Sequence, residues 1–500
     1  MTSINSDFMS QLALRSLGNS SNMMTQAMER LSTGKRVNSA ADDAAGLGIA
    51  TKLKAQVNSL NAASRNATDA LALIGTIDGA LEESSEILLR MRELAVQSAS
   101  DTNTGTDRSF IQDEINQLNN ELNRISSSTE FNSVKLLDGT YNNKQIQIGT
   151  SANQVFNIGV TSTDAATLGA YQMESLAEHN ATATATAAAA VTAATALIDA
   201  GGDYTVKGSF GSTTVNIAAG DDAKTVAQSF NLAAGTTGIT AAAITKAKIT
   251  AVSAETYSFT LKGKSDTAST VNATVTSATN LTALKDAINS VSGATGITAA
   301  LTEDLSGINL VQQDGFDIVV GDVTSSGSGT MTMGAADKNG DAVSQAAVAL
   351  GGATGTDSQV IIGQISLSSH KAFTVTSGNA ANHFATDTAA QTSTLQTMGA
   401  VDISSQSGAT NALSVIDGAI AMVSEIRSEM GAAENRLTST VDNLSNVSVN
   451  TQRSLTAVED ANFASETSAL TKAQILQQAA TSMLAQANKA KQTMLVLLQG

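Results

Sequence analysis

Apolar and small residues recur at alternating spacings of three and four along residues 53–95, and over about six heptads this pattern indicates the seam of a coiled coil. The chain contains no proline, so nothing forces a helix over residues 44–100 to break. A stripe this long cannot be buried by its own helix, so the sequence predicts partner helices elsewhere in the chain. The two seam positions carry Leu53, Leu60, Ala67, Ile74, Leu81, Leu88 and Ala95 on one side, and Gln56, Ala63, Ala70, Ile77, Ser84 and Met91 on the other.

Two other regions carry the same spacing and are predicted to complete this rod. Residues 111–125 follow a polar turn and are expected to fold back antiparallel on the long helix, while residues 413–444 continue the seam pattern near the C-terminus. The expected rod core is Leu53, Leu60, Ile74, Leu81, Leu88, Ile115, Leu122, Leu413, Ile416, Ile420, Leu437 and Leu444.

Both ends of the chain are predicted to be seam helices that need partners. Alanine at several consecutive seam positions of the C-terminal segment lets helices approach closely, which is typical of a tightly packed assembly. Asp42 and Asp43, which precede the long helix, are expected to cap it rather than to hold a metal ion. The expected packing residues of the two ends are Leu14, Leu17, Met24, Met28, Leu31, Ala473, Leu476, Ala480, Met483, Ala487 and Leu497.

The middle of the chain, residues 174–400, has a different character, with many glycines and alternating threonine and valine. It contains an internal repeat, because Phe230-Asn231 followed by Gly238-Ile239-Thr240-Ala241 recurs as Ile288-Asn289 followed by Gly296-Ile297-Thr298-Ala299. We expect two related α+β modules, at about 203–255 and 256–320, and a β-hairpin before them at 145–160. The predicted fold class is thus mostly α at both ends, as long antiparallel coiled-coil rods, with an inserted β-rich α+β region.

Composition excludes several classes of function. A formal net charge of −17 argues against nucleic acid as a partner, because there is no basic excess to release phosphate counterions. The absence of cysteine removes disulfides, thiolate metal sites and cysteine nucleophiles. Residues 1–17 lack the apolar region of a cleaved signal peptide, and no apolar run is long enough to predict a membrane span.

An enzyme is the main alternative class, and the sequence gives it no support. The three histidines, His179, His370 and His383, all lie in the insert and outside any spacing typical of a metal site or a catalytic triad. No glycine-rich phosphate loop is present either. We therefore expect no catalytic residues, no metal site and no cofactor.

Four sequence runs resemble bacterial flagellin closely. These runs are Leu31–Leu47 (LSTGKRVNSAADDAAGL), Arg90–Gln97 (RMRELAVQ), Glu130–Gly139 (EFNSVKLLDG) and Thr471–Ala480 (TKAQILQQAA). The resemblance covers about residues 1–173 and 400–498, and the middle resembles the variable insert of flagellins.

This resemblance implies a structural subunit that is exported through the flagellar type III channel and self-assembles into the bacterial flagellar filament, outside the cell. In this family the terminal helices, here about 1–33 and 455–500, form an inner tube, and the long helix with residues 107–128 and 408–448 forms an outer tube. The implied division is 1–43 and 451–500 for the inner tube, 44–173 and 401–450 for the outer tube, and 174–400 for the solvent-facing insert. The implied partners are further copies of the chain, an export chaperone, the cap protein and the hook–filament junction protein.

The family also implies contacts with host sensors of flagellin. Arg90, Leu94 and Glu114 match positions through which flagellins contact the vertebrate flagellin-sensing Toll-like receptor, although these residues equally suit contacts within the rod. The terminal leucines match those read by the cytosolic inflammasome receptor, but Gln499-Gly500 stand where the family usually ends in arginine. These leucines are Leu495, Leu497 and Leu498.

The hook–filament junction protein of the same family is the second reading of the resemblance. Its equivalent of the Asp42-Asp43 site typically continues with proline, whereas this chain continues with Ala44-Ala45-Gly46, as flagellins do. A third hypothesis, that the insert binds a surface or carries O-linked sugars, has no identifiable site.

Overall fold

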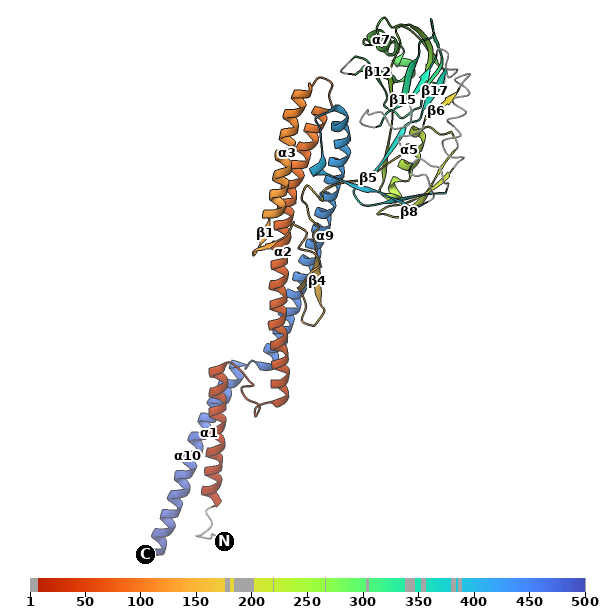
Figure 1. Cartoon of the computed structure of the whole chain (residues 1–500). Coiled ribbons are helices and arrows are strands. Elements are labelled where there is room, and N and C mark those ends of the chain that lie inside the picture. Colours follow the sequence, from red (N-terminus) through yellow and green to blue (C-terminus); the bar gives the residue numbers. More distant parts are fainter. Residues whose placement is uncertain are drawn as a thin grey trace. The chain divides into compact units, whose positions relative to one another are not determined.

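The structure is a computed structural model that describes residues 8–175, 180–183, 202–218, 220–265, 267–302, 305–337, 347–351, 357–378, 384 and 389–499. The chain divides into two compact units. Unit 1 consists of Met1–Gly75, Asn143–Ile158 and Gly431–Gly500, and unit 2 of Thr76–Asn142 and Gly159–Met430. The long helices are α1 (Phe8–Thr33), α2 (Ala44–Ser98), α3 (Gly105–Ser128), α9 (Gln406–Glu459) and α10 (Phe463–Gln499) (Figure 1). The expectation of helical ends around a β-rich insert is confirmed.

Helix α2 buries the stripe that the heptads predict. From Leu60 to Ala95 every residue at the two seam positions is buried, and Leu81 and Leu88 are fully enclosed. The stripe fades towards the N-terminal end of α2, where Leu53 is half-buried. Gln56, which we placed on the seam, is exposed, and Val57 is buried in its place, because an apolar side chain gains more from burial than an amide.

Helix α9 runs antiparallel to α2. In unit 2, the Arg427 guanidinium donates to Asp78 at 2.8 Å, and the Arg92 guanidinium donates to Asp417 at 2.6 Å. In unit 1, Leu444 joins Leu60 and Ala63 of α2 in one buried cluster.

The seam of α9 differs in one detail from the prediction. Ile416, Leu437 and Leu444 are buried as expected, but Leu413 and Ile420 are only half-buried. Ala412 and Ala419 occupy the seam instead, one residue earlier in each case. Small side chains at those positions let the two helices approach closely, and the leucine and isoleucine then flank the contact.

Helix α3 folds back on α2, as predicted. Thr104 and Asp107 form a reciprocal capping box at its first turn. The Arg108 guanidinium then donates to the Ser98 carbonyl of α2 at 2.8 Å, and Ile115 and Leu122 are fully buried.

Two hairpins accompany the rod. In unit 2, β1 (Glu130–Phe131) pairs with β2 (Val134–Lys135). In unit 1, β3 (Lys144–Gln147) pairs with β4 (Val155–Ile158), which is the hairpin that the sequence predicts. It lies on both long helices, because Asn66 of α2 donates to the Gln147 carbonyl at 2.9 Å and the Arg436 guanidinium of α9 lies 4.9 Å from the Phe156 ring centre.

The insert in unit 2 is built from three larger sheets. The eight-stranded sheet has the order β12-β13-β9-β18-β5-β21, with β15 and β16 joined at β9; the other two have the orders β11-β10-β14-β17-β6 and β20-β19-β7-β8. The strands are β5 (Gly169–Glu174), β6 (Asn180–Ala183), β7 (Gly202–Lys207), β8 (Ser212–Ile217), β9 (Thr240–Thr250), β10 (Thr256–Lys262), β11 (Ser269–Thr274), β12 (Ile297–Leu301), β13 (Ile308–Gln312), β14 (Ile318–Ser325), β15 (Met331–Ala335), β16 (Val348–Leu350), β17 (Ser358–Ile361), β18 (Gln364–Ser369), β19 (Thr374–Ser377), β20 (Gln391–Thr392) and β21 (Thr394–Thr397). The short helices are α5 (Ala223–Leu232), α6 (Ala234–Thr237), α7 (Thr282–Ser290), α8 (Ser292–Thr295) and η1 (Met398–Ala400).

The repeated motif forms the same local structure in both copies. Asn231, near the C-terminal end of α5, donates to the Ala241 carbonyl and accepts from the Ala241 N–H, both at 2.8 Å. Asn289 makes the same two bonds with Ala299, at 2.9 and 2.8 Å. Gly238 and Gly296 end α6 and α8 with φ values of 75° and 70°, a conformation that side chains disfavour.

The two copies are nested rather than consecutive. The second copy is contiguous, since its helix α7 is followed by β12, β13 and β14, and β14 pairs with β10. In the first copy, by contrast, β9 pairs with β18 and β7 pairs with β19. Its buried core accordingly combines Tyr204 and Phe230 with Leu367 and Phe373. The first copy therefore extends beyond the expected residues 203–255 and closes only after the second copy has been inserted.

The last helix begins later than the predicted boundary. Helix α9 continues to Glu459, and α10 begins at Phe463. The helical structure is therefore interrupted at residues 460–462 and not near residue 451. Among the described helices, only α9 has an 18-residue window apolar enough to cross a bilayer, with a mean hydropathy of 1.2. Its fully buried Ile416, Val423 and Leu437 follow the seam spacing, as in a helix that packs on other helices.

Candidate assembly surface

Helices α1 and α10 of unit 1 form an antiparallel pair through a seam of small residues (Figure 1). Ser10, Ser20 and Ala27 of α1 are buried, as are Ala473 and Ala480 of α10. Near the end of the pair, the Arg30 guanidinium donates to the Glu466 carboxylate at 3.2 Å. Small side chains on both helices allow close approach, but they bury little apolar surface.

The predicted packing residues divide into two groups. Ala473 and Ala480 are buried, and Leu17, Met24, Leu31 and Ala487 are half-buried along the seam. Exposed fractions are 53% for Leu14, 51% for Met28, 38% for Leu476 and 58% for Met483. These four lie outside the seam of the single chain, because serine and alanine occupy the contact positions between them. The Leu497 side chain lies outside the described residues, as do those of Leu495 and Leu498.

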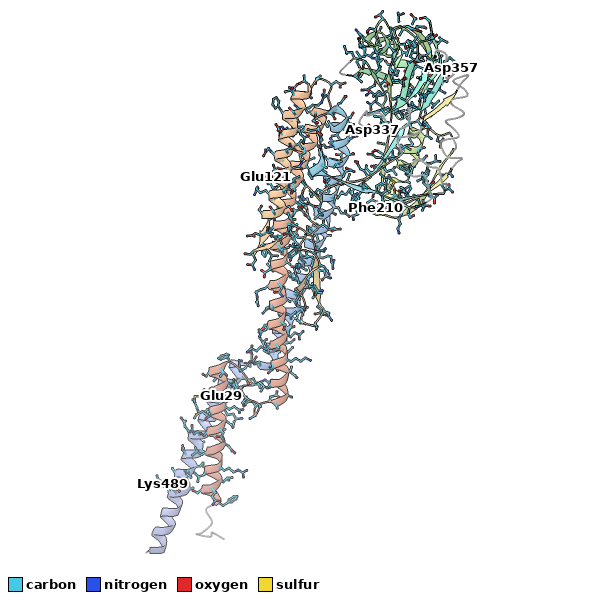
Figure 2. The ribbon with its side chains drawn as sticks, in the orientation of Figure 1. Glu29, Glu121, Phe210, Asp337, Asp357 and Lys489 are labelled. Atoms are coloured by element: carbon cyan, nitrogen blue, oxygen red, sulfur yellow. The ribbon has the colours of Figure 1, made fainter. Side chains whose placement is uncertain are left out.

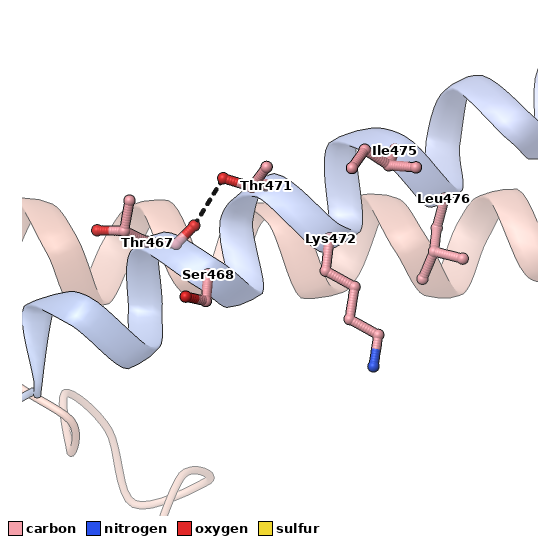
Figure 3. A pocket seen from close by; sticks show the side chains of 6 residues that line it. All are labelled: Thr467, Ser468, Thr471, Lys472, Ile475 and Leu476. Atoms are coloured by element: carbon pink, nitrogen blue, oxygen red, sulfur yellow. Dashed lines mark hydrogen bonds between the residues drawn. The ribbon is translucent and has the colours of Figure 1, made fainter.

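The single chain thus leaves large apolar side chains uncovered on the sides of both helices away from the seam, and we call these residues the apolar flanks. Figure 3 shows Ile475 and Leu476 projecting from α10, beside a groove of about 450 Å³ that also contacts Lys472. Glu29 and Lys489 mark the two helices in Figure 2. The apolar flanks are Phe8, Leu12, Leu14, Met23 and Met28 of α1, and Phe463, Ile475, Leu476 and Met483 of α10.

Sequence reasoning placed four of these residues, Leu14, Met28, Leu476 and Met483, in the seam, and it did not select the other five because it considered a single seam only. A usable signal was present: α1 carries more apolar residues than a single seam holds, and Leu12 and Met23 do not fit the spacing of the others. A helix with apolar residues on several sides is one that is buried on several sides in its working state.

The linker between α1 and α2 is held by its two aspartates. Asp43 accepts a bond from the Gly46 N–H at 2.8 Å and so caps α2, as expected. Asp42 accepts from the Ser39 N–H and hydroxyl, both at 2.9 Å, and these bonds, with one from Gln26, lower the pKa of the Asp42 carboxyl. Lys35 pairs with Glu459.

A cavity of about 730 Å³ lies beside this linker. Val37 and Ala50 form an apolar part of its wall, and Lys35 and Lys54 bring positive charge to it. The side chains come from the linker, from the first turns of α2 and from the end of α9.

On the rod surface of unit 2, the residues expected to contact a host receptor do not behave alike. The Arg90 guanidinium donates to Glu114 at 2.8 and 3.0 Å and to Glu93 at 2.6 Å, and these bonds raise the pKa of Arg90. The Arg90 and Glu114 side chains are each 44% exposed. Leu94 is 1% exposed and packs inside the rod of the single chain, and its part in a receptor contact stays a prediction.

The described residues contain no group of three or more histidine, cysteine, aspartate or glutamate side chains that could hold a metal ion. His370 lies 3.6 Å from the Glu425 carboxylate of α9, which also binds Lys371. His179 and His383 lie outside the described residues. His370 therefore lies beside an ion pair between Lys371 and Glu425.

Three family models match the chain. The model of the bacterial flagellin N-terminal helical region matches residues 4–142, and that of the C-terminal helical region matches residues 413–498. The model of the flagellin hook IN motif matches residues 258–314, within the second copy of the repeat.

The curated relatives align along the whole chain. A B-type flagellin of Pseudomonas aeruginosa is 35% identical over 501 residues, and a flagellin of Salmonella rubislaw is 33% identical over 520 residues, with 99% of each chain covered in both cases. The solved structure of FliC from Burkholderia pseudomallei covers 73% of this chain and 99% of its own, at 18% identity and a TM-score of 0.29. That of flagellar hook associated protein-3 from Legionella pneumophila covers 82% and 99%, at 11% identity and a TM-score of 0.35. Both TM-scores are low, and it is through its sequence relatives that this chain belongs to the bacterial flagellin family.

Proposed function

We propose that this flagellin, a structural subunit of the bacterial flagellar filament, assembles by burying the apolar flanks of α1 and α10 against further copies of itself. The observation that carries the proposal is the contrast within one helix pair. The most buried positions of its inner contact are serine and alanine, while large apolar side chains, such as Ile475 at 60% exposed and Met483 at 58%, are left uncovered.

The magnitude of the apolar burial supports this role. Full burial of one large apolar side chain stabilises a complex by roughly 1.5–3 kcal/mol. The nine side chains of the apolar flanks together expose the equivalent of about five whole side chains, so their full burial is worth roughly 7–15 kcal/mol, which is of the same order as the cost of about 4–15 kcal/mol for association. One exposed residue would carry no such argument, but nine along two paired helices do.

The geometry of growth follows from the kind of contact. A filament grows when one surface of a subunit binds a different surface of the next, because such a contact does not close on itself. We propose that the apolar flanks supply such unlike surfaces, with α1 of one copy packing on α10 of another. The division into inner-tube residues, 1–43 and 451–500, and outer-tube residues, 44–173 and 401–450, is part of this proposal, as is a solvent-facing insert.

The same proposal places the chain outside the cell and names its other partners. The uncovered terminal helices would require an export chaperone before assembly, and the filament ends would meet the cap protein and the hook–filament junction protein. Shearing intact cells tests the location: the chain should be released with the sheared filaments and not remain with the cell pellet.

Seeded growth tests the assembly surface directly. Purified protein is dissociated by heat, cooled with short filament seeds and imaged by electron microscopy. We expect the wild-type chain to elongate the seeds, and Ile475→Ser to raise the monomer concentration needed for elongation by about tenfold or more, as the loss of a buried apolar side chain predicts.

Leu232→Ser is the matched control. Leu232 is 89% exposed on the insert, so the same kind of substitution there should leave elongation unchanged. Equal effects of the two variants, or wild-type elongation by Ile475→Ser, would contradict the proposed surface. Failure of the wild-type chain to elongate seeds that a control flagellin elongates would favour the junction-protein alternative.

A further inference from the structure

The two nested copies of the repeat share the eight-stranded sheet, where β9 of the first copy pairs with β13 of the second, and they also meet at one turn. The turn between β13 and β14 of the second copy reaches α5 and β9 of the first, where the Lys224 N–H donates to the Gly315 carbonyl at 3.2 Å and the Thr245 hydroxyl donates to the Phe316 carbonyl at 2.7 Å. The Lys224 ammonium also lies 4.1 Å from the centre of the Phe316 ring. We call residues 314–317, with the residues of the first copy that they contact, the module joint.

Gly363, where the chain returns from the second copy to the first, closes the other side of the joint. A Cβ added to Gly363 would lie 2.7 Å from Ala223 Cβ at the start of α5 and 2.9 Å from the Gly315 carbonyl oxygen. The backbone at Gly363 therefore contacts both copies with no room for a side chain.

Asp317 brings a carboxyl group into this packed joint. It accepts a hydrogen bond from the Gly363 N–H, but its Oδ1 atom is shielded from solvent and has no hydrogen-bond partner. An ionised oxygen in such a place loses its hydration without gaining a replacement, which disfavours the charged form.

The charges around Asp317 do not compensate for this loss. Asp222 caps α5 with its carboxylate and raises the pKa of Asp317 further, whereas Lys262 of β10 opposes the rise only weakly. Lys224 of α5 is directed to the Phe316 ring and, at 3.9 Å, to Asp314. Burial first, and Asp222 second, raise the pKa of the Asp317 carboxyl to about 7.

We propose that Asp317 is a proton-binding site that tightens the module joint between the two copies of the repeat when the proton is bound and loosens this joint when the proton is lost. Protonation removes the buried charge at Oδ1, which has no hydrogen-bond partner, and ends the repulsion with Asp222. The ligand is the proton, and the response is a change in how firmly the second copy packs on the first.

The direction of the pH dependence follows from the raised pKa. Below about pH 4 the Asp317 carboxyl is protonated whether or not the joint is closed, so ionisation of Asp317 adds no free-energy cost to closing the joint. Between pH 4 and 7 the carboxyl of the open joint is ionised, whereas that of the closed joint is still protonated. Closing the joint then requires uptake of a proton, so the free-energy cost of closing it grows as the pH rises. Above pH 7 both states are ionised, and the joint stays at its weakest.

Amide hydrogen exchange of the full-length monomer tests this proposal and does not depend on filament assembly. After correction for intrinsic exchange rates, we expect the Gly363 amide and the turn at residues 312–317 to be at least tenfold better protected at pH 5.5 than at pH 8, since each unit between two pKa values is a factor of ten. Asp317→Asn should be equally protected at both pH values, because it cannot ionise.

Two further variants keep the outcome decisive. Asp314→Asn, in the same turn but exposed, should respond like the wild type. Asp222→Asn retains a capping side chain while removing the neighbouring charge, so it should keep the response but move its midpoint to lower pH. A wild-type chain without the response, or an Asp317→Asn chain that retains it, would overturn the proposal.

Discussion

At the scale of single residues, spacing on a helix does not settle which side chains meet a partner. Arg90 and Leu94 are four residues apart, so they lie one turn from each other on α2. Yet Arg90 is exposed and held by Glu93 and Glu114, while Leu94 is enclosed. Substitutions at the two positions should therefore act by different physical routes.

Arg90→Ala should lower activation of the vertebrate flagellin-sensing Toll-like receptor by about tenfold, as loss of an arginine at a contact surface typically does. Its fold should not change, because the ion pairs of an exposed arginine contribute little to stability. A receptor reporter assay and circular dichroism check the two statements.

Arg92→Ala is the control for that experiment. Arg92 is a neighbouring exposed arginine with an ion pair of its own, to Asp417, and should leave receptor activation unchanged. Full activity of the Arg90→Ala chain would remove this residue from the proposed receptor contact. Loss of activity in a Leu94 variant would say nothing about contact unless its fold were intact.

At the scale of helices and strands, the sequence predicts the structure well where the spacing of apolar residues allows only one set of seam positions. Leucine and isoleucine every seventh residue fix the seam of α2 at Ile74, Leu81 and Leu88, and all three are buried. In parts of α9 and α10 large apolar residues stand near small ones, so two alignments of the seam are possible. At Leu413 and Ile420 of α9, and at Leu476 and Met483 of α10, nearby alanines are the buried residues instead. Close approach of alanines decides between them, and the linear pattern contains no measure of that distance.

The nested insert could not be predicted for a related reason. The repeated motif lies in the contiguous part of each copy, around Asn231 and Asn289, where local hydrogen bonds demand the same residues. The strands that complete the copies, β18 and β13, share little beyond alternation. Which strands pair is decided by tertiary packing, and the two strands can be separated by any number of residues in the chain.

Leu367→Ala tests the nested order of strands. Leu367 of β18 is fully buried in the core of the first copy, so its truncation should cost roughly 2–5 kcal/mol and expose β7 and β8, more than 140 residues away, to exchange or proteolysis. Strands β10 and β11 of the second copy should remain protected.

Leu310→Ala in β13 is the reciprocal variant. Leu310 is buried in the core of the second copy and should expose β10 and β11 first. If Leu367→Ala exposed β10 and β11 and left β7 and β8 protected, the two copies would be consecutive modules and the nested arrangement would be wrong.

At the scale of the whole molecule, charge is divided unevenly between the two units. Unit 1 contains 13 lysine and arginine residues against 10 aspartate and glutamate residues, whereas unit 2 contains 15 against 35. The formal net charge of −17 is therefore a property of unit 2, while the unit that carries the apolar flanks is nearly neutral. Assembly brings many acidic units close together, so their repulsion opposes the burial of the apolar flanks.

Salt should consequently favour filament growth. The Debye length falls from about 30 Å at 0.01 M to about 8 Å at 0.15 M ionic strength, which screens repulsion between exposed carboxylates on neighbouring copies. We expect the critical monomer concentration for seeded elongation to fall severalfold over this range.

A triple variant tests the same repulsion at low salt. Its substitutions, at exposed residues of unit 2 that form no ion pair within the described part of the chain, are Asp101→Asn, Asp113→Asn and Glu130→Gln. This variant should elongate better than the wild type at low salt, and its elongation should depend less on salt. A critical concentration that rises with salt would instead mean that the basic excess of unit 1 attracts the acidic unit of a neighbouring copy, and that charge attraction assists the apolar flanks in holding the filament together.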